Sequence, residues 1–377
     1  MQVEQIIYDS SGRRNPAGAP ILSNKAQFVL IFGNKEQLLQ PHIYEELRQL
    51  YPAAYLLGGT TAGEIYEDMA TDGTVSATAV YMERSEVRFA SVAIEAGQYI
   101  QAAAALIDQL PTQGLRHVFV LSEGININGS KLVDGLSHSL PEGVTLSGGL
   151  AGDGNNYQET FILANARPQR DRLAAIGFYG AHIHFGYASQ GGWSPFGIER
   201  LITRSQDNIL YTFDDKPALA LYRQYLGEYA EGLPAAGLYF PLMVRSPDYR
   251  HTFIRTIQRL NEEQDALVFS GDVPQGYYSK LMRSNFDRLI EGSREAARQS
   301  LEMIGGTAEL AILVSCVGRK LVLDQLTSEE VEAGRRVMGK ETIFTGFYSY
   351  GEILSQPAST DCELHNQTMT ITVLREE

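Results

Sequence analysis

A glycine-rich stretch that follows an apolar run and ends near an acidic residue occurs three times in this chain. The stretches, called turn 1, turn 2 and turn 3 below, are residues 57–65, 146–153 and 345–353, and their acids are Glu64, Asp153 and Glu352. Each acid follows an earlier glycine at a similar distance: 31 residues after Gly33, 29 after Gly124 and 34 after Gly318. A repeat of this length indicates one large structural unit used several times.

The same order of elements precedes each turn. Apolar runs predict first strands at 26–33, 117–121 and 309–315, and second strands at 53–60, 144–148 and 343–346. Between them, amphipathic spacing predicts helices at 38–50, 130–140 and 328–338. A strand-helix-strand step of this length suits a right-handed crossover between parallel neighbours, and later strands are expected to be antiparallel. The predicted fold class is α/β of a mixed α+β kind: repeated strand-helix-strand units forming mixed β-sheets, with helices on the outer faces.

The remaining segments give a coarser pattern. Helices are expected at 99–110 and 217–229, and a long helical stretch at 276–304. The segments 74–82 and 87–94 are expected to be antiparallel strands joined at 83–86, and 200–204 is expected to form a hairpin with 209–213. Further single strands are expected at 160–164, 173–179, 182–188, 238–244, 253–260 and 368–374. Residues 327–330 resemble a capping box. A shift in composition near 180–200 predicts three parts: an irregular lead-in at 1–25 with at most one short strand, a domain at 26–190 and a domain at 191–377.

Composition narrows the function classes. The net charge of −14 argues against nucleic acid and anionic membranes as partners, because both attract basic surfaces. The sequence has no run of 18 apolar residues, so no membrane span is predicted. The first residues lack the basic-then-apolar order of a signal peptide. Two cysteines do not make a disulfide framework, so a cytoplasmic location is expected. The sequence also lacks a phosphate loop, a dinucleotide fingerprint, His-Glu-x-x-His and Cys-x-x-Cys, which disfavours an enzyme.

The turns allow two interpretations. Exposed amides in glycine turns cradle anions, and a neighbouring acid would fix an ammonium, so the turns would line one ligand cleft. Alternatively, glycine serves tight turns and the acid caps a backbone. Aromatic residues replace small ones in turn 3, as the wall of a pocket would require. The candidate ligand-binding residues of the turns are Thr60, Thr61, Glu64, Gly149, Asp153, Tyr348, Tyr350 and Glu352.

Five further residues are candidates for ligand contact. Trp193 and Phe196 lie in a glycine-rich loop, where they would wall a pocket or plug a core. Cys316 ends an apolar run and is either an inert buried thiol or a nucleophile. Arg319 would pair with a ligand carboxylate or with an acid of the chain. His365 would point into the cleft beside Glu352 or form a polar strand entrance.

His182 and His184 alternate with apolar residues and would share one face of a strand. They are candidate metal ligands, because a neutral imidazole is the usual proximal ligand of haem iron. The alternative is two histidines on the wet face of a sheet.

Taken together, these segments resemble the FIST family of sensory domains. Residues 58–65 and 147–154 are similar to the N-terminal half of the family, residues 192–197 to its junction, and residues 216–219, 315–319, 346–353 and 365–368 to its C-terminal half. The resemblance implies a ligand-binding sensor rather than a named reaction, with small molecules such as amino acids as ligands. A stand-alone bacterial subgroup includes haem-binding nitric oxide sensors that act on a partner histidine kinase, and no diagnostic motif places the chain in it.

The expected function is a non-enzymatic intracellular sensor that binds a small ligand and signals to a partner such as a histidine kinase, with haem-based nitric oxide sensing as one variant. An amino-acid sensor without haem is an alternative. So are an enzyme that uses Cys316, Glu352 and His365, and a purely structural interaction module. The ligand, the partner and the oligomeric state, with a homo-oligomer among the alternatives, stay open.

Overall fold

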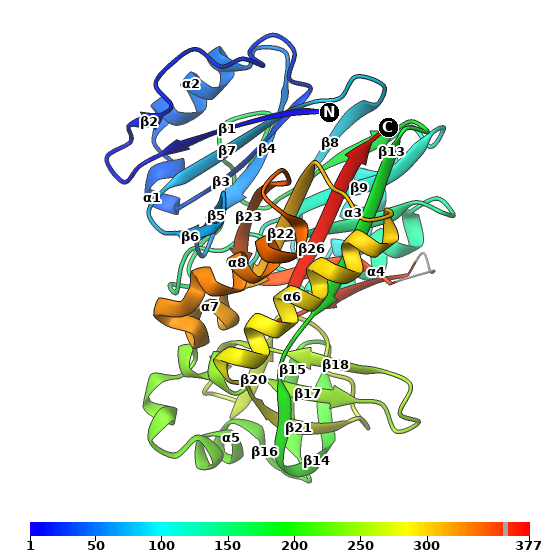
Figure 1. Cartoon of the computed structure of the whole chain (residues 1–377). Coiled ribbons are helices and arrows are strands. Elements are labelled where there is room, and N and C mark those ends of the chain that lie inside the picture. The colour runs from blue at the N-terminus through cyan, green and yellow to red at the C-terminus, as the bar shows by residue number, and fades with distance from the viewer. Residues whose placement is uncertain (357–360) are drawn as a thin grey trace.

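The computed structural model describes residues 1–356 and 361–377. Three mixed β-sheets form an upper body, and a smaller β-rich domain lies below it (Figure 1). The predicted fold class is therefore confirmed: repeated units form mixed sheets, and helices cover the outside.

Each sheet of the body is built around one repeated unit. Sheet 1 has the order β11 (Ile162–Ala164), β4 (Tyr55–Thr60), β3 (Phe28–Gly33), β7 (Val75–Tyr81), β1 (Gln2–Tyr8) and β2 (Arg14–Asn15). Sheet 2 has the order β25 (Cys362–His365), β24 (Gly351–Ser355), β10 (Thr145–Leu150), β9 (Leu115–Ser122), β12 (Arg172–Tyr179) and β8 (Glu86–Ala93). Sheet 3 has the order β13 (Ile183–Gln190), β26 (Met369–Glu376), β22 (Leu310–Cys316), β23 (Ile343–Ser349), β5 (Glu64–Tyr66) and β6 (Met69–Thr71).

The helices connect and cover these sheets. They are α1 (Lys35–Leu38) and α2 (Pro41–Leu50) on sheet 1, α3 (Tyr99–Ile107) and α4 (Gly129–Ser139) on sheet 2, and α6 (Phe286–Met303), α7 (Val317–Leu323), the short η3 (Asp324–Leu326) and α8 (Thr327–Met338) on sheet 3. Asparagine begins three of them, because the side chains of Asn34, Asn128 and Asn285 accept a hydrogen bond from an amide in the first turn of α1, α4 and α6.

The central pair of each sheet is the predicted parallel crossover. β3 pairs with β4, β9 with β10 and β22 with β23, all in parallel. The strand after each turn then leaves its own unit. β5 joins β23 of sheet 3, β11 joins β4 of sheet 1 and β24 joins β10 of sheet 2. This cyclic exchange ties the three units into a closed ring, which brings the three turns to one place.

The apolar core has an inner and an outer part. Side chains from the inner faces of all three sheets meet in one cluster, where Phe32 of β3 stacks on Phe347 of β23 at 4.6 Å and Phe28 meets Phe178 of β12 at 5.4 Å. The opposite faces are covered by the helices. Within residues 1–356 and 361–377, the structure has no helix long and apolar enough to cross a membrane.

The smaller domain is inserted between β13 and α6. Its strands are β14 (Ser194–Gln206), β15 (Ile209–Phe213), β16 (Lys216–Pro217), β17 (Leu242–Arg245), β18 (Thr252–Arg255), β19 (Ile257–Asn261), β20 (Ala266–Phe269) and β21 (Tyr278–Arg283), with the helices α5 (Ala218–Leu226), η1 (Gly227–Gly232) and η2 (Ala235–Tyr239). The predicted hairpin is present, since β14 pairs with β15. The domain docks on the body through Asn366 and Gln367, which bond to Ser270 and to the Leu238 carbonyl at 2.5 and 3.1 Å.

Four predicted elements are wrong. The stretch 1–25, expected to hold at most one short strand, contains β2 and also β1, which pairs over all seven residues with β7 while its outer face stays partly exposed. β7 and β8 do not pair, since the chain crosses from sheet 1 to sheet 2 between them. The expected helix at 276–304 begins only at Phe286, because the preceding residues form β21 between β14 and β17. The capping box is absent, because η3 runs directly into α8.

Candidate functional site

The three turns bond to one another at the centre of the ring. The Ala62 amide donates to the Tyr348 carbonyl and the Tyr348 amide to the Gly63 carbonyl, both at 2.8 Å. The Gly152 amide donates to the Thr60 carbonyl at 2.9 Å, and the Tyr350 amide to the Leu150 carbonyl at 3.2 Å. Turn 1 is thus joined to turns 2 and 3, and turn 3 to turn 2. The structure brings together all eight candidate residues of the turns, and they are buried there.

The first glycine of each turn has a packing role. A β-carbon on Gly58 would lie 2.1 Å from the Ile31 carbonyl oxygen of the neighbouring parallel strand. On Gly148 and Gly346 it would lie 1.9 Å from the carbonyl oxygens of Val120 and Leu313, which occupy the equivalent places in the other sheets. The repeated glycine therefore allows the close approach of the two parallel strands.

The acids of turns 1 and 3 lie in matching cages. Glu64 accepts hydrogen bonds from the Thr61 hydroxyl at 2.6 Å and from the amide and hydroxyl of Thr74. Glu352 accepts equivalent bonds from the Ser349 hydroxyl at 2.6 Å and from the amide and hydroxyl of Thr368. Burial raises the pKa of Glu64 to about 7 and that of Glu352 to about 8, against the opposing effect of these donors.

The acid of turn 2 is held differently. Asp153 accepts bonds from the amides of residues 157, 158 and 159 and from the Tyr350 hydroxyl, and Lys35 lies 3.8 Å from its carboxylate. The Tyr350 hydroxyl also contacts the Gly154 carbonyl at 3.0 Å, and its ring stacks on Tyr157 at 4.3 Å. Tyr350 therefore fastens turn 3 to the loop that follows turn 2.

Tyr350→Phe is expected to lower the free energy of unfolding by about 1–3 kcal/mol, because it removes the one hydroxyl proton that the Asp153 carboxylate and the Gly154 carbonyl share, and with it the acceptor of the Asp153 amide. Urea denaturation measures the change. Tyr229→Phe, at an exposed tyrosine of the inserted domain, is the control and should be neutral. Equal stabilities of the two variants would show that the Tyr350 hydroxyl does not hold the loop.

A buried ion pair supports turn 3 from outside. The Arg319 guanidinium on α7 donates to the Glu330 carboxylate on α8 at 2.8 and 3.0 Å, and both side chains have no exposed area. Arg319 also donates to the carbonyls of Gly191 and Leu289, while Glu330 accepts from the hydroxyls of Tyr348 and Ser315. Sequence reasoning missed Glu330. The available signal was its spacing with Thr327, Val331 and Gly334, which places it on the buried face of α8.

The other candidates lie around the turns without forming one cluster of contacts. Cys316 is buried at the end of β22, and burial raises the pKa of its thiol. His365 pairs across β24 and β25 with Glu352, and burial lowers its pKa. It lines a hollow of about 540 Å³ with Tyr187, Met303 and Leu354.

The two aromatic candidates lie where the inserted domain begins. The Trp193 indole donates to the Gln367 carbonyl at 3.0 Å, next to the docking contact of that domain. Phe196 lies on β14 near Phe240 and beneath Arg283. Neither belongs to the hydrogen-bonded group formed by the turns.

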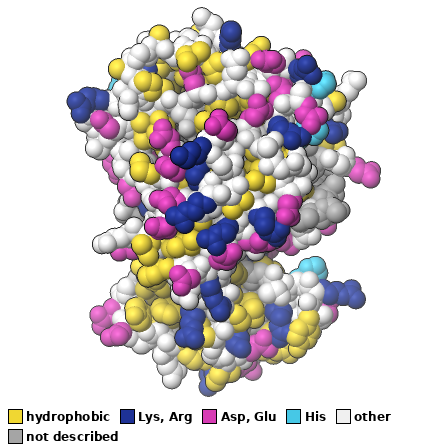
Figure 2. Space-filling view, in the orientation of Figure 1, with side chains coloured by type: hydrophobic (Ala, Val, Ile, Leu, Met, Phe, Trp, Pro, Cys, Tyr) yellow, Lys and Arg dark blue, Asp and Glu magenta, His cyan; other side chains and the backbone are white. Residues whose placement is uncertain are grey.

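A cleft of about 790 Å³ opens beside the joined turns, and we call it the junction cleft. Its lining is Ala62, Ala70, Asp72, Gly154, Asn155, Tyr239, Phe286, Lys320, Leu321, Val322, Asp324, Gln325, Thr327 and Ser328. These residues come from all three units and from η2 of the inserted domain. Figure 2 shows a waist between the upper body and the lower domain, with hydrophobic side chains gathered at its left edge. Two candidate residues of the turns, Thr61 and Asp153, directly precede the lining residues Ala62 and Gly154 in the chain.

A lysine spans the floor of the junction cleft. The Lys320 ammonium donates to the Ala62 carbonyl at 2.8 Å and contacts the Asp72 carboxylate. It also lies 5.5 Å from the centre of the Tyr348 ring. Lys320 therefore connects α7 of the third unit to turns 1 and 3.

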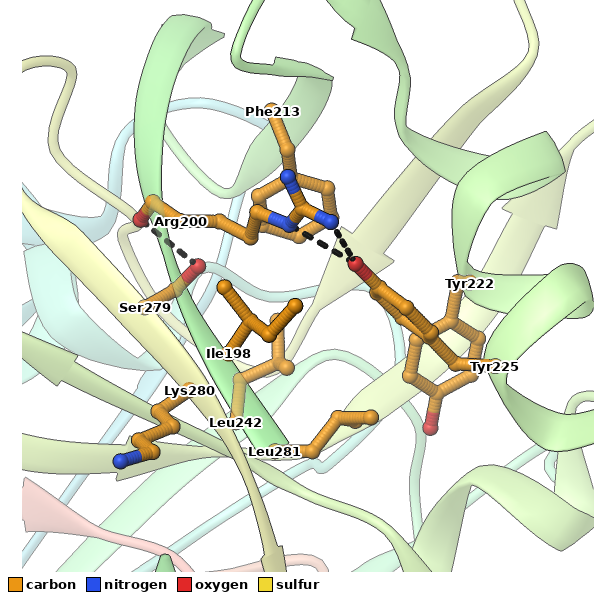
Figure 3. Close-up of a pocket in the computed structure, with 9 residues that line it drawn as sticks. All are labelled: Ile198, Arg200, Phe213, Tyr222, Tyr225, Leu242, Ser279, Lys280 and Leu281. Atoms are coloured by element: carbon orange, nitrogen blue, oxygen red, sulfur yellow. Dashed lines mark hydrogen bonds between the residues drawn. The ribbon is translucent and has the colours of Figure 1, made fainter. Parts of the chain in front are cut away.

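The hollow drawn in Figure 3 is much smaller. It lies in the inserted domain between Arg200, Tyr225 and apolar side chains, and the Tyr225 hydroxyl accepts from Arg200 (Figure 3). Its volume of about 10 Å³ holds about one water molecule. It has no room for a metabolite.

The two candidate metal ligands lie away from the turns. His184 pairs with Arg375 near the end of β26, whereas Glu352 contacts Thr368 before its start, so about 20 Å of strand separates them. His182 is exposed, and the His184 Nε2 atom lies 3.4 Å from the Glu377 carboxylate. Haem binding by His182 or His184 stays a prediction. The residues that the structure describes contain no group of three or more His, Cys, Asp or Glu arranged to hold a metal ion.

Comparison with known proteins identifies the family of the chain. The model of the FIST N domain matches residues 27–216, and that of the FIST C domain matches residues 218–355. The chain belongs to the FIST family, whose domains are sensory domains.

Two individual proteins are also similar. The uncharacterized protein MJ1623 of Methanocaldococcus jannaschii is 22% identical over 238 residues, which cover 56% of this chain and 46% of that protein. The chain thus spans about half the length of this curated relative. A crystal structure of cyanuric acid hydrolase from A. caulinodans aligns over 100% of this chain and 99% of its own, with 9% identity and a TM-score of 0.38. A likeness this low carries no argument about function.

Proposed function

We propose that the protein is a non-enzymatic intracellular sensor, that a small molecule binds in the junction cleft, and that binding is read by a partner protein such as a histidine kinase. The observation that carries this proposal is the lining of the cleft, to which all three units and the inserted domain contribute. A cleft of several hundred Å³ at a boundary between domains is the usual setting of a small-molecule site.

The lining also suggests how binding would reach a partner. Tyr239 belongs to the inserted domain, whereas Ala62 and Lys320 belong to the body. A ligand that contacts both sides favours the arrangement in which both contacts are made, so it shifts the population of relative domain positions. The surface that the partner recognises would then change without a chemical step.

The non-enzymatic part of the proposal rests on the buried state of the alternative catalytic group. Cys316 is 1% exposed and burial raises the pKa of its thiol, which disfavours the thiolate that a nucleophile needs. Both oxygens of Glu352 already accept hydrogen bonds from Ser349 and Thr368. The alternative of an amino-acid sensor that binds no haem is compatible with the mixed polar and apolar lining of the cleft. The haem variant stays a prediction.

The test uses the wild-type chain, a cleft variant and a matched surface variant. Gln325 is exposed and lines the cleft, so Gln325→Trp fills it; Gln101 is exposed on α3, so Gln101→Trp controls for the added indole. A set of metabolites is screened by thermal shift. We expect to find a ligand that raises the melting temperature of the wild type and of Gln101→Trp equally, by a few degrees. The same ligand should raise the melting temperature of Gln325→Trp much less.

Two results would overturn the proposal. One is that each bound compound stabilises Gln325→Trp as well as the wild type, which would move the site elsewhere. The other is conversion of the bound compound, detected by mass spectrometry after incubation, which would make the protein an enzyme. An absorption spectrum of the same sample, with and without added haem, decides the haem variant by the presence of a Soret band.

A further inference from the structure

We infer that the junction cleft recognises its ligand through a positively charged amine. This inference rests on the proposed function, and it adds the chemical class of the ligand. The first observation is the set of charged groups in the lining: two carboxylates, Asp72 and Asp324, and one ammonium, Lys320. A chain with a net charge of −14 adds a general attraction for cations.

The floor of the cleft already accommodates an ammonium of the chain itself. The Lys320 ammonium lies against a carbonyl oxygen of turn 1, the Asp72 carboxylate and the face of Tyr348. A carbonyl, a carboxylate and an aromatic face are the groups that bind an alkylammonium. The walls at this end of the cleft therefore favour a positive charge.

Three donors of the lining are engaged inside the protein. Lys320 donates to Ala62 and Asp72, the Gly154 amide donates to the Thr61 carbonyl, and the Thr327 hydroxyl donates to the Asp324 carbonyl. An anionic ligand would have to break these bonds to gain the cleft's ammonium or either of the other two donors. In contrast, the Asp324 carboxylate makes no ion pair with any residue among 1–356 and 361–377. The cleft offers an acceptor where a ligand would need one.

Two exposed aromatic side chains complete the site. Tyr239 of the inserted domain is 40% exposed, and Phe286 at the start of α6 is 47% exposed. Large exposed aromatic rings that line a cleft beside a free carboxylate provide cation–π contacts to an ammonium and apolar contacts to its carbon chain. The class of ligand that fits is an organic amine with an apolar or aromatic body.

The experiment compares three probes of one shape and different charge: phenethylammonium, phenylacetate and 2-phenylethanol. Calorimetry at neutral pH and low salt measures their binding to the wild type, Asp324→Asn, Gln325→Trp and the control Asp108→Asn, at the exposed C-cap of α3. Phenethylammonium is expected to bind the wild type and Asp108→Asn at least roughly tenfold more tightly than either other probe does. It is expected to bind Asp324→Asn roughly tenfold more weakly than it binds the wild type. Asparagine suits position 324 because it tolerates the positive φ of 47° found there.

The outcomes separate the inference from the proposed function. Phenylacetate or 2-phenylethanol binding as tightly as the amine, and losing affinity in Gln325→Trp, would overturn the cationic class and keep the sensor cleft. Amine binding that Gln325→Trp leaves unchanged would overturn the inference, because the amine would bind elsewhere. Absence of amine binding at millimolar concentration, or equal binding to Asp324→Asn, would overturn it as well.

Discussion

Arg319→Met is expected to lower the free energy of unfolding by about 3–5 kcal/mol. The variant leaves the Glu330 carboxylate in the interior without its cation, next to the Tyr348 and Ser315 hydroxyls. It also removes the donors that Arg319 gives to the carbonyls of Gly191 and Leu289, at the start of the inserted domain and in α6. Urea denaturation of the full chain measures the loss.

The double variant Arg319→Met with Glu330→Leu is expected to recover much of this loss, because replacing both partners leaves no unpaired charge. Arg298→Met is the matched surface control: Arg298 pairs with Glu295 and Glu302 on the exposed face of α6, so it should change stability by less than about 1 kcal/mol. If Arg319→Met were no more harmful than Arg298→Met, the buried ion pair would not support the turn.

The repeated units could be predicted because each one carries its own local pattern. Gly33, Gly124 and Gly318 recur at similar distances from an acid, and the apolar runs between them have the length of strands. Local periodicity therefore identified the parallel pairs β3–β4, β9–β10 and β22–β23. The full length of β1 and the strand β21 were missed, because their pairing partners rather than their own composition determine them.

The exchange of strands between units could not be read from a local pattern. β5 pairs with β23, whose residues lie almost three hundred positions later, and no residue type in either strand identifies the partner. The same limit applied to the site. Thr61, Glu64, Asp153, Tyr348, Tyr350 and Glu352 were selected as candidates and do lie together, but Lys320, Tyr239 and Phe286 were not. Their common feature is exposure at one cleft, which only the assembled domains create.

Arg319 illustrates the same point from the opposite side. Its position after β22 allowed either a ligand carboxylate or an acid of the chain as its partner. The structure provides Glu330, eleven residues later, together with carbonyls from two other elements. The choice depends on α7 and α8 folding back onto sheet 3, which the amphipathic pattern of α8 alone does not specify.

Raising the pH through neutrality is expected to destabilise the protein through Glu64 and Glu352. Their carboxyls have an ordinary pKa of 4.5, and burial raises it to about 7 and about 8 in the folded chain. Between these values the folded protein keeps protons that the unfolded chain releases. The stability contributed by each group is therefore fully present below pH 4.5 and is lost as the pH rises through the folded pKa.

Glu352→Gln and Glu64→Gln are expected to remove their shares of this dependence. A rise of the pKa from 4.5 to about 8 corresponds to roughly 5 kcal/mol, and a rise to about 7 to roughly 3 kcal/mol. Glutamine keeps an acceptor, and its amide can donate to the hydroxyls of Ser349 or Thr61, which accept as well as donate. Each variant should thus gain stability relative to the wild type as the pH rises from 5 to 9.

The measurement is the difference in unfolding free energy between each variant and the wild type, because other groups titrate in the same range. His117 acts in the opposite direction: burial lowers its pKa to about 3, so its contribution is present above its ordinary pKa of 6.5 and is lost as the pH falls. Asp72 near Glu64, and Arg319 near Glu352, are kept in the variants, so only their interaction with the removed carboxyl differs. Glu231→Gln, at an exposed position in η1, controls for the loss of one carboxylate. Parallel curves for Glu352→Gln and Glu231→Gln would mean that the buried carboxyl of turn 3 stays ionised throughout, and that its three hydrogen-bond donors rather than a proton offset its burial.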